Sequence, residues 1–352
     1  MERRPIAQPL DPFILPDLLS TKRTTDLDIA DLELMHHFLT VTSLLLSSHD
    51  SPEAQALWQV HAVRLGFKHE FLLRGILAVA ALHLGYLLPD RRSAYELKAS
   101  THQEIALQSF QDTLARVDES NCHALFTFSC LIIIMAFASP RKEDPQAEIL
   151  HWFHLLRGCN SVLQLHWDLL RNSFLSPLLE EMSYTVTKAA HNVPDTDRIM
   201  DLQTVCCNPA QQSREVSQAY QLAIHELLKV FIQASVVRSR GEGTVLATLV
   251  WPINLSPKYL ELLAEQQAEA MVILAHYCIL LHWADEEDEW FLRGWARYTL
   301  DTIKASVGES WHESLAWPEA VVYSTSGSNS EYHMSAARRR AVEMSISIMR
   351  AC

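Results

Sequence analysis

Apolar residues recur at steps of three and four along most of the chain, the spacing that places side chains on one face of an α-helix. One such stripe, in the segment 93–117, consists of Tyr95, Ala99, His102, Ala106, Phe110, Leu114 and Val117. A second consists of Leu260, Leu263, Gln267, Met271, Leu274, Cys278 and Leu281, and it predicts one helix that starts at Ser256 and Pro257. Strands require an alternation of apolar and polar residues, which the sequence lacks. The pattern therefore predicts an all-α chain of about ten or more helices.

Capping and breaking residues predict where several helices begin and end. Ser51 is a predicted N-cap with Pro52 at the first helical position, and Gly66 ends that helix. Ser213 starts a long helix. The residues 191–212 have no strong period, so we expect a long loop or short irregular helices there.

Three segments are apolar on nearly every face: 74–88, 125–138 and 270–281. Such helices are buried all round, either in an ordinary core or around an apolar ligand cavity. The most apolar stretch, residues 124–138, is shorter than the ~20 residues needed to cross a bilayer, so we expect a core helix and no membrane span. The residues expected to line a cavity, because they lie on these central helices, are Leu72, Ile76, Val79, Phe126, Cys130, Met271, Leu274 and Cys278.

The composition fits one folded domain inside the cell. The chain has 352 residues, of which 49% are hydrophobic and 20% charged, so it can form a large core. Residues 1–25 lack periodicity and predict a flexible tail, and residues 26–352 predict a single helical domain. The formal charge of −13 makes the whole chain a poor electrostatic match for DNA. Seven cysteines without a secretory signal favour reduced thiols in the cytosol or nucleus.

The stretch MVILAHYCILLHWADEEDEW (271–290) joins an apolar run to a cluster of acids. Carboxylates spaced by three or four residues hold Mg²⁺ in terpene cyclases, and Asp285, Glu286, Asp288 and Glu289 have this spacing. The cluster lies late in the chain, however, and no second metal motif follows it. The favoured interpretation is a buried helix that ends in a solvated acidic turn, with His276 bonded to a neighbouring helix.

Other candidate metal motifs are incomplete. The residues 225–229 approach the zinc motif His-Glu-x-x-His, but Lys229 stands where the second histidine is needed. Three Glu-x-x-His motifs, which begin at Glu33, Glu148 and Glu309, keep a helical metal-dependent oxygenase open as an alternative. Glycine-rich phosphate loops and the Gly-x-Ser-x-Gly motif do not occur. We therefore expect a protein that is not an enzyme and needs no cofactor; the alternatives are that oxygenase and a terpene cyclase-like enzyme of secondary metabolism.

Five blocks of the sequence follow one another in a characteristic order. They are LELMHHFLTVTSLLLS, LWQVHAVRLGFKHEFLLRGILAVAALHLGYL, WPINLSPKYLELLAEQQAEAMVILAHYCILLH, GWARYTLDTI and SWHESLAWP. In this order they resemble the regulatory region of fungal Zn₂Cys₆ transcription factors of the sterol uptake control type. The resemblance covers roughly residues 30 to 320 and is weaker in the middle section.

The resemblance implies an all-helical effector domain that binds a sterol or another apolar small molecule and contacts other transcriptional regulators. It also implies control of lipid, sterol or secondary-metabolite genes, a nuclear location with shuttling from the cytoplasm, and homo- or heterodimers. The family carries an N-terminal zinc cluster of six cysteines, whereas the first cysteine here is Cys122. Because such a cluster needs closely spaced thiolates, we expect no direct DNA binding by this chain. A truncated regulator, a missing first exon and a co-regulator that acts through a partner all fit this departure.

Overall fold

The computed structural model describes residues 28–46, 52–141, 145–182, 193–208, 212–241, 243–287, 289–324, 340–344 and 346–347. Regular secondary structure in these residues is helical throughout, which confirms the predicted all-α class. The predicted tail and the predicted N-cap Ser51 lie outside the described residues. The division into a tail and one domain at residue 25 therefore stays a prediction.

The helices fall into three consecutive groups. The first is α1 (Ile29–His37), α2 (Ser43–Leu45), α3 (Pro52–Ala56), α4 (Val63–Gly66), α5 (Glu70–Leu87) and α6 (Arg92–Leu114), with π-helical turns at Phe38–Thr42 and Leu57–Ala62 and a 3₁₀ turn at Pro89–Arg91. The second is α7 (Cys122–Ala138), α8 (Pro145–Leu165), α9 (Trp167–Arg171) and α10 (Ser176–Met182). The third is α11 (Thr196–Cys206), α12 (Arg214–Ser239), α13 (Val245–Asn254), α14 (Pro257–Ala264), α15 (Ala268–Glu286), α16 (Trp295–Ser306) and α17 (His312–Val322), with a 3₁₀ turn at Glu309–Trp311.

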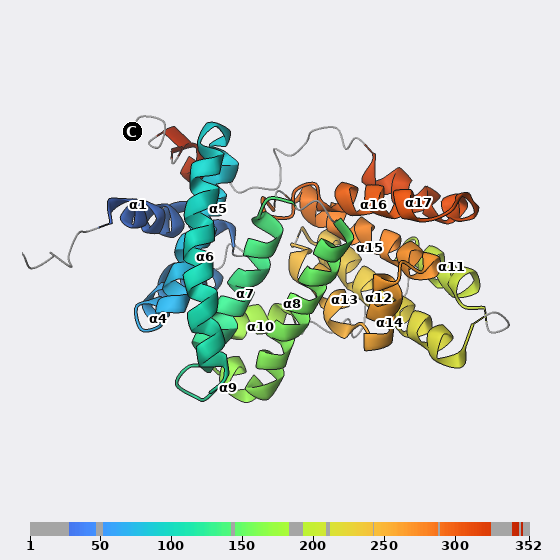
Figure 1. Ribbon diagram of the computed structural model, residues 1–352, viewed down its shortest axis with the longest axis horizontal. Coiled ribbons are helices and arrows are strands. Elements are labelled where there is room, and N and C mark those ends of the chain that lie inside the picture. The colour runs from blue at the N-terminus through green and yellow to red at the C-terminus, as the bar shows by residue number, and fades with distance from the viewer. Residues whose placement is uncertain are drawn as a thin grey trace, which may run out of the picture.

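These three groups follow one another along the long axis of the molecule (Figure 1). Helices α1, α4, α5 and α6 form one end, and α11 to α17 form the other. Helices α7 to α10 lie between the two ends, where α7 packs against α5 and α8 packs against α13. The middle group therefore connects the two ends of the molecule.

Helix α5 is the central helix of the N-terminal end. It packs against α1, α4, α6 and α7, and the side chains of Leu72, Ile76 and Val79 have no exposed surface. By length and composition alone α5 could cross a membrane, but 72% of this stretch is buried inside the protein. Burial on all sides agrees with the central helix that its apolar sequence predicts.

Helices α5 and α7 approach each other closely at Gly75. A Cβ atom at this position would lie 2.6 Å from Cε2 and 2.7 Å from Cδ2 of Phe128. The buried ring of Phe128 also packs against the rings of Phe71 and Phe110, with centroid distances of 5.4 and 4.9 Å. Glycine at position 75 therefore provides the space that this aromatic cluster fills.

The predicted stripe of α6 is buried along most of the helix. Its buried members are Tyr95, Ala99, His102, Ala106 and Phe110. Leu114, however, is 40% exposed, so the prediction is wrong at this residue. Helix α6 has 23 residues and its partner α5 has 18, and a short turn joins them. The last turn of α6 therefore extends beyond the helix that covers the stripe.

Two predictions for the C-terminal end are also wrong. The segment 191–212, predicted as a loop or short irregular helices, contains the regular helix α11, of 11 residues.

The stripe from Leu260 to Leu281 belongs to two helices, α14 and α15, and not to one. The chain turns at Gln266, whose φ is 57°, and three consecutive polar residues occupy the turn. Three consecutive polar residues can form a turn or lie between the apolar positions of a helix. The periodicity therefore does not show that the helix is interrupted here. The predicted caps Ser213 and Ser256 are confirmed.

The acidic residues at the end of α15 bind the starts of two other helices. Gly294, the N-cap of α16, donates its backbone N–H to Oδ2 of Asp285 at 2.9 Å. Thr244, the N-cap of α13, donates its backbone N–H to Oε2 of Glu287 at 2.7 Å. Carboxylates stabilise helix N-termini because they pair with unsatisfied N–H groups at the positive end of the helix dipole.

The predicted solvated turn is therefore wrong for the described acids. The four that the structure describes, Asp285, Glu286, Glu287 and Glu289, are all partly buried. Glu286 forms an ion pair with Arg238 of α12 at 2.7 Å, and Asp288 lies outside the described residues. The other half of the prediction is confirmed, because every residue of the run 270–281 is buried.

The Gly75→Ala variant tests the close contact between α5 and α7. We expect it to lose about 1–3 kcal/mol of unfolding free energy, because the added methyl group must displace the ring of Phe128 in a packed core. The matched control is Gly158→Ala on α8, where nothing lies within 4 Å of the new Cβ atom. Alanine is the better helix former by about 0.5–1 kcal/mol, so this variant should gain stability. Urea unfolding measures both, and a Gly75→Ala variant as stable as the parent would contradict the contact.

Candidate functional site

An apolar cavity of about 100 Å³ lies between α7, α8 and α13, and we call it the apolar cavity. Helix α7 contributes Phe126, Cys130, Ile133 and Ile134 to its wall. Helix α8 contributes Leu156, Cys159, Asn160 and Leu163, and α13 contributes Val245, Leu246, Leu249 and Ile253. The remaining lining residues are Leu46, Trp58, Leu178, Glu289 and Phe291. The wall is thus almost entirely apolar, with Asn160 and Glu289 as its polar members.

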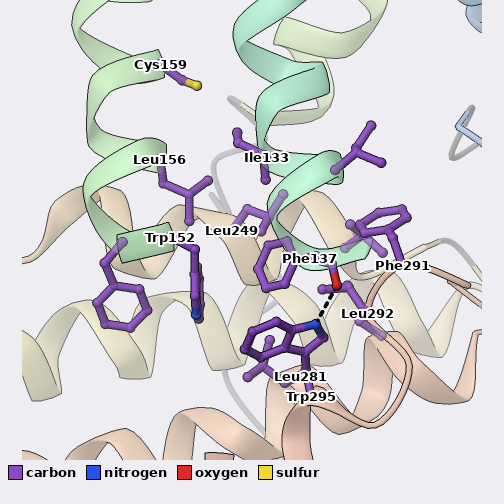
Figure 2. Packing of buried hydrophobic residues seen from close by; sticks show 14 of the residues in the cluster. Ile133, Phe137, Trp152, Leu156, Cys159, Leu249, Leu281, Phe291, Leu292 and Trp295 are labelled. Atoms are coloured by element: carbon purple, nitrogen blue, oxygen red, sulfur yellow. Dashed lines mark hydrogen bonds between the residues drawn. The ribbon is translucent and has the colours of Figure 1, made fainter. Parts of the chain in front are cut away.

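The sequence of each helix explains its part of the wall. Helix α7 is apolar on nearly every face, so one face packs on α5 while another meets α8 across the cavity. Figure 2 shows Ile133, Leu156 and Leu249, one from each helix, together in the space between them. Side chains from three helices meet here without filling the space completely, which leaves room for small apolar groups.

The two cysteines of the wall are inert thiols. Burial raises the pKa of Cys159 to about 12, and burial also raises the pKa of Cys130 well above its usual range. Cys159 donates its S–H to the backbone oxygen of Ser129 at 3.1 Å. Because nucleophilic attack and metal binding need the thiolate, these residues act as small apolar groups in the wall.

The structure brings two of the eight predicted site residues to this cavity, Phe126 and Cys130. The other six lie in the core away from its wall: Leu72, Ile76 and Val79 on α5, and Met271, Leu274 and Cys278 on α15. Sequence reasoning missed the contributions of α8 and α13. The apolar run VLATLV at the start of α13 was the available signal, but burial of one helix does not say which other helix it meets.

The end of α7 is joined to α16 beside the cavity. The indole Nε1 of Trp295 donates to the backbone oxygen of Phe137 at 2.9 Å (Figure 2). This oxygen belongs to the last turn of α7, where carbonyl groups have no partner within the helix. The rings of Phe137 and Trp295 meet edge to face, with centroids 5.3 Å apart. The bond therefore fixes α7, one wall of the cavity, to the C-terminal end of the molecule.

A proline in α13 determines how that helix is held. Pro252 lies inside the helix and has no N–H, so the backbone oxygen of Thr248, four residues earlier, lacks its helical donor. The hydroxyl of Tyr277 on α15 donates to this oxygen at 3.0 Å. Tyr277 and Thr248 are both fully buried, so water cannot replace the bond.

Helix α13 has a second buried anchor on its other neighbour. The indole Nε1 of Trp251 donates to the backbone oxygen of Ala223 on α12 at 2.9 Å. Trp251 also stacks on the ring of Tyr277, with centroids 4.6 Å apart. The cavity wall formed by α13 is therefore fixed to both α12 and α15.

Comparison with known proteins finds a family that part of this helical array resembles. Residues 33–188 match the family model described as the fungal specific transcription factor domain. The chain is similar to this family over that segment, which is less than half of its length. A Zn(2)-C6 fungal-type transcription factor of Gibberella zeae is 25% identical over 332 residues, which is 88% of this chain and 65% of that protein. The sequence resemblance to fungal Zn₂Cys₆ regulators is thereby confirmed.

Two further relatives are similar to parts of the chain. The Zn(2)-C6 fungal-type transcription factor afumD of Aspergillus fumigatus is 21% identical over 252 residues, 71% of this chain and 66% of that protein. Sterol uptake control protein 2 of Candida albicans is 23% identical over 159 residues, 44% of this chain and 22% of that protein. The chain thus spans just under two thirds of the length of the first two relatives.

The apolar cavity crosses the border of the matched segment. Helices α7 and α8 lie within residues 33–188, the segment that matches the family model, whereas α13 lies beyond it. The longer match to the Gibberella zeae regulator covers most of the chain and so extends past that border. The cavity is therefore formed jointly by the matched segment and the residues that follow it.

The metal and catalytic alternatives gain no support from the described residues. Among them, no group of three or more His, Cys, Asp or Glu side chains could hold a metal ion. His276 donates its Nδ1–H to the backbone oxygen of Val272, in its own helix, at 2.9 Å, so the predicted bond to a neighbouring helix is wrong. Its ring instead packs on Trp317 of α17, and burial lowers its pKa to about 4.

A double-mutant cycle tests how α13 is held. Tyr277→Phe leaves the buried oxygen of Thr248 without a donor, and we expect it to cost about 1–3 kcal/mol of unfolding free energy. Pro252→Ala restores the helical N–H, so Tyr277→Phe should cost clearly less in that background. Denaturant unfolding of the four proteins gives the coupling. An equal cost of Tyr277→Phe in both backgrounds would show that the missing proline N–H does not explain the bond.

Proposed function

We propose that the chain is the regulatory part of a fungal transcription regulator of the sterol uptake control type, and that it responds to an apolar metabolite in the apolar cavity. The observation that carries the proposal is the position of this cavity between α7, α8 and α13. An apolar molecule there contacts both the matched transcription factor domain and the C-terminal helices. The relatives are transcription factors, which supports a regulatory role in the nucleus rather than catalysis. Sterol, lipid or secondary-metabolite genes are the proposed targets.

The size of the cavity determines how a ligand must enter. Pockets for drug-sized ligands measure about 300–1,000 Å³, whereas this cavity measures about 100 Å³. It is nearer to an engineered cavity of about 150 Å³ that binds benzene. A sterol, with four fused rings, therefore fits only if one wall moves. In the described state the cavity is too small for a sterol, and ligand binding selects a state in which it is larger.

Helix α13 is the proposed moving wall. It is short, with 10 residues, and proline interrupts its hydrogen bonding. Because it is bonded to α12 through Trp251 and to α15 through Tyr277, displacement of α13 changes the packing of both helices. Helix α15 in turn packs against α16 and α17. Ligand occupancy would thus alter the C-terminal surface that other regulators or a second copy contact.

The ligand role of the eight residues named from the sequence stays a prediction. Phe126 and Cys130 are the two that the proposal uses, because they line the cavity. The six on α5 and α15 are fully or almost fully buried and act in the proposal as the fixed core against which α7 and α13 pack.

A thermal-shift experiment tests the proposal. Ergosterol and farnesol are the probes, and a ligand at about 100 times its Kd should add about 2.7 kcal/mol of stability by mass action and raise the Tm. The Leu163→Trp variant puts a larger side chain into the cavity and should abolish the shift. Its matched control is Leu165→Trp on the same helix, where leucine is 73% exposed, and this variant should keep the full shift.

Two results of this experiment would contradict the proposed ligand site. If neither probe shifts the Tm, or if both tryptophan variants respond alike, the apolar cavity is not the ligand site. A role in protein–protein contacts alone would then be favoured.

A further inference from the structure

The wall of the apolar cavity contains one side-chain amide, that of Asn160 on α8. The residues of α8 that line the cavity are Leu156, Cys159, Asn160 and Leu163, and their spacing of i, i+3, i+4 and i+7 defines one face of the helix. Because the other positions of this face are apolar, packing alone would favour an apolar residue at position 160. The amide is therefore a candidate for recognising a polar group of a ligand.

Asn160 has unused hydrogen-bonding capacity. Its Oδ1 accepts from Nε2 of Gln164 at 3.5 Å, which is longer than the usual range of about 2.7–3.2 Å, and its Nδ2 has no partner among the described residues. Asn160 is half-buried, so it lies where the cavity meets the solvent. A hydroxyl group is the matching ligand group, because a hydroxyl can donate to Oδ1 of the amide or accept from its Nδ2.

The wall favours a neutral ligand. Lys, Arg and His are absent from the residues that line the cavity in the described part of the chain. The wall includes one carboxylate, that of Glu289, and a carboxylate repels an anionic ligand. Most of the lining residues are apolar, and burying a charged group against them costs free energy. Fatty acids and other carboxylates are therefore poor ligands for this cavity, whereas a neutral alcohol suits it.

The volume of the cavity limits the apolar part of the ligand to about one ring. An engineered cavity of about 150 Å³ binds benzene, and the apolar cavity measures about 100 Å³. Its contact with the solvent at Asn160 lets a substituent of the ring extend out of the cavity. The wall also includes the aromatic rings of Trp58, Phe126 and Phe291, which pack favourably on a flat ring. A single aromatic ring with one short polar substituent is therefore the ligand body that needs the least movement of the wall.

We propose that the apolar cavity, at its described size, binds a single-ring aromatic alcohol. The ring lies between Trp58, Phe126 and Phe291, and the hydroxyl group pairs with the amide of Asn160. This ligand class deepens the function proposed above and rests on it, because both place a ligand in the apolar cavity. Asn160 is then the residue that selects for the hydroxyl group.

Such an alcohol acts in the opposite direction to a sterol. A sterol needs a larger cavity, so its binding favours a displaced α13, whereas a single-ring alcohol binds at the described size and favours the described position of α13. The two ligands occupy the same space, so they exclude each other. The position of α13 thereby depends on the relative concentrations of two neutral ligands of different size.

Calorimetric titration of the full chain with benzyl alcohol, toluene and benzoate tests this site. Toluene lacks the hydroxyl group, and benzoate has a charged group in its place, so benzoate should bind about tenfold more weakly than benzyl alcohol. The Asn160→Leu variant keeps the shape of the side chain without the amide. It should bind benzyl alcohol about fivefold more weakly, the equivalent of about 1 kcal/mol, as expected for one hydrogen bond. Its affinity for toluene should stay the same or rise, which separates loss of hydroxyl recognition from loss of fold.

A matched variant and a competition experiment complete the test. Gln164→Leu removes the exposed amide that pairs with Asn160 but does not line the cavity, so binding of benzyl alcohol should stay unchanged. Benzyl alcohol at about ten times its Kd should raise the apparent Kd of ergosterol about tenfold.

Four results would each overturn the proposal: no binding of benzyl alcohol, equal losses for benzyl alcohol and toluene in Asn160→Leu, equal effects of Asn160→Leu and Gln164→Leu, or an affinity for ergosterol that benzyl alcohol does not change. If ergosterol fails to bind while Asn160→Leu selectively weakens benzyl alcohol, the proposed response to a sterol is wrong and the alcohol site is supported.

Discussion

The hydrogen bond from Tyr277 to the backbone oxygen of Thr248 is the interaction on which the C-terminal half of this protein depends. Pro252 removes the N–H that would normally bind this oxygen, and the oxygen is buried where water cannot reach it. Helix α13 can therefore persist through its proline only because another helix provides the donor. The position of α13, and with it one wall of the apolar cavity, is consequently set by α15.

Helix α15 fixes its neighbours at several further points. Its C-terminal acids bind the first N–H groups of α13 and α16, so α13 is bound to α15 both at its start and in its middle. The apolar run 270–281 packs in the core, which keeps these donors and acceptors in place. The loop after α15 carries Phe291, which lines the apolar cavity. A ligand in that cavity would therefore contact this loop as well as α13.

The sequence predicted single helices well and their mutual arrangement poorly. Periodicity and apolar content identified α5, α7 and α15 as central, and all three are buried, because burial on every face depends only on the residues of that helix. The apolar cavity is different, since it forms where α7, α8 and α13 meet, far apart in the sequence. Of the eight predicted site residues, Phe126 and Cys130 line it because α7 happens to face α8 and α13, whereas α5 and α15 do not reach it.

Two sequence patterns also led to wrong predictions because they did not indicate contacts with backbone groups. The acids after residue 284 have the composition of a solvated turn, yet they serve as caps for helices that begin at residues 245 and 295, which no local pattern reveals. The polar residues 265–267 continue a helical stripe but form a turn. In both cases the structure is determined by backbone groups, and the pattern of apolar and polar side chains does not indicate what a backbone group will bind.

The affinity of the Tyr277→Phe variant for ergosterol tests the central claim most directly. If the bond to Thr248 holds α13 in the closed position, its removal lowers the cost of opening the apolar cavity. The variant should then be less stable than the parent protein and yet bind ergosterol more tightly, by up to about tenfold for a bond of about 1.4 kcal/mol. Unchanged or weaker binding by a folded Tyr277→Phe protein would contradict the claim that α13 is the wall that moves.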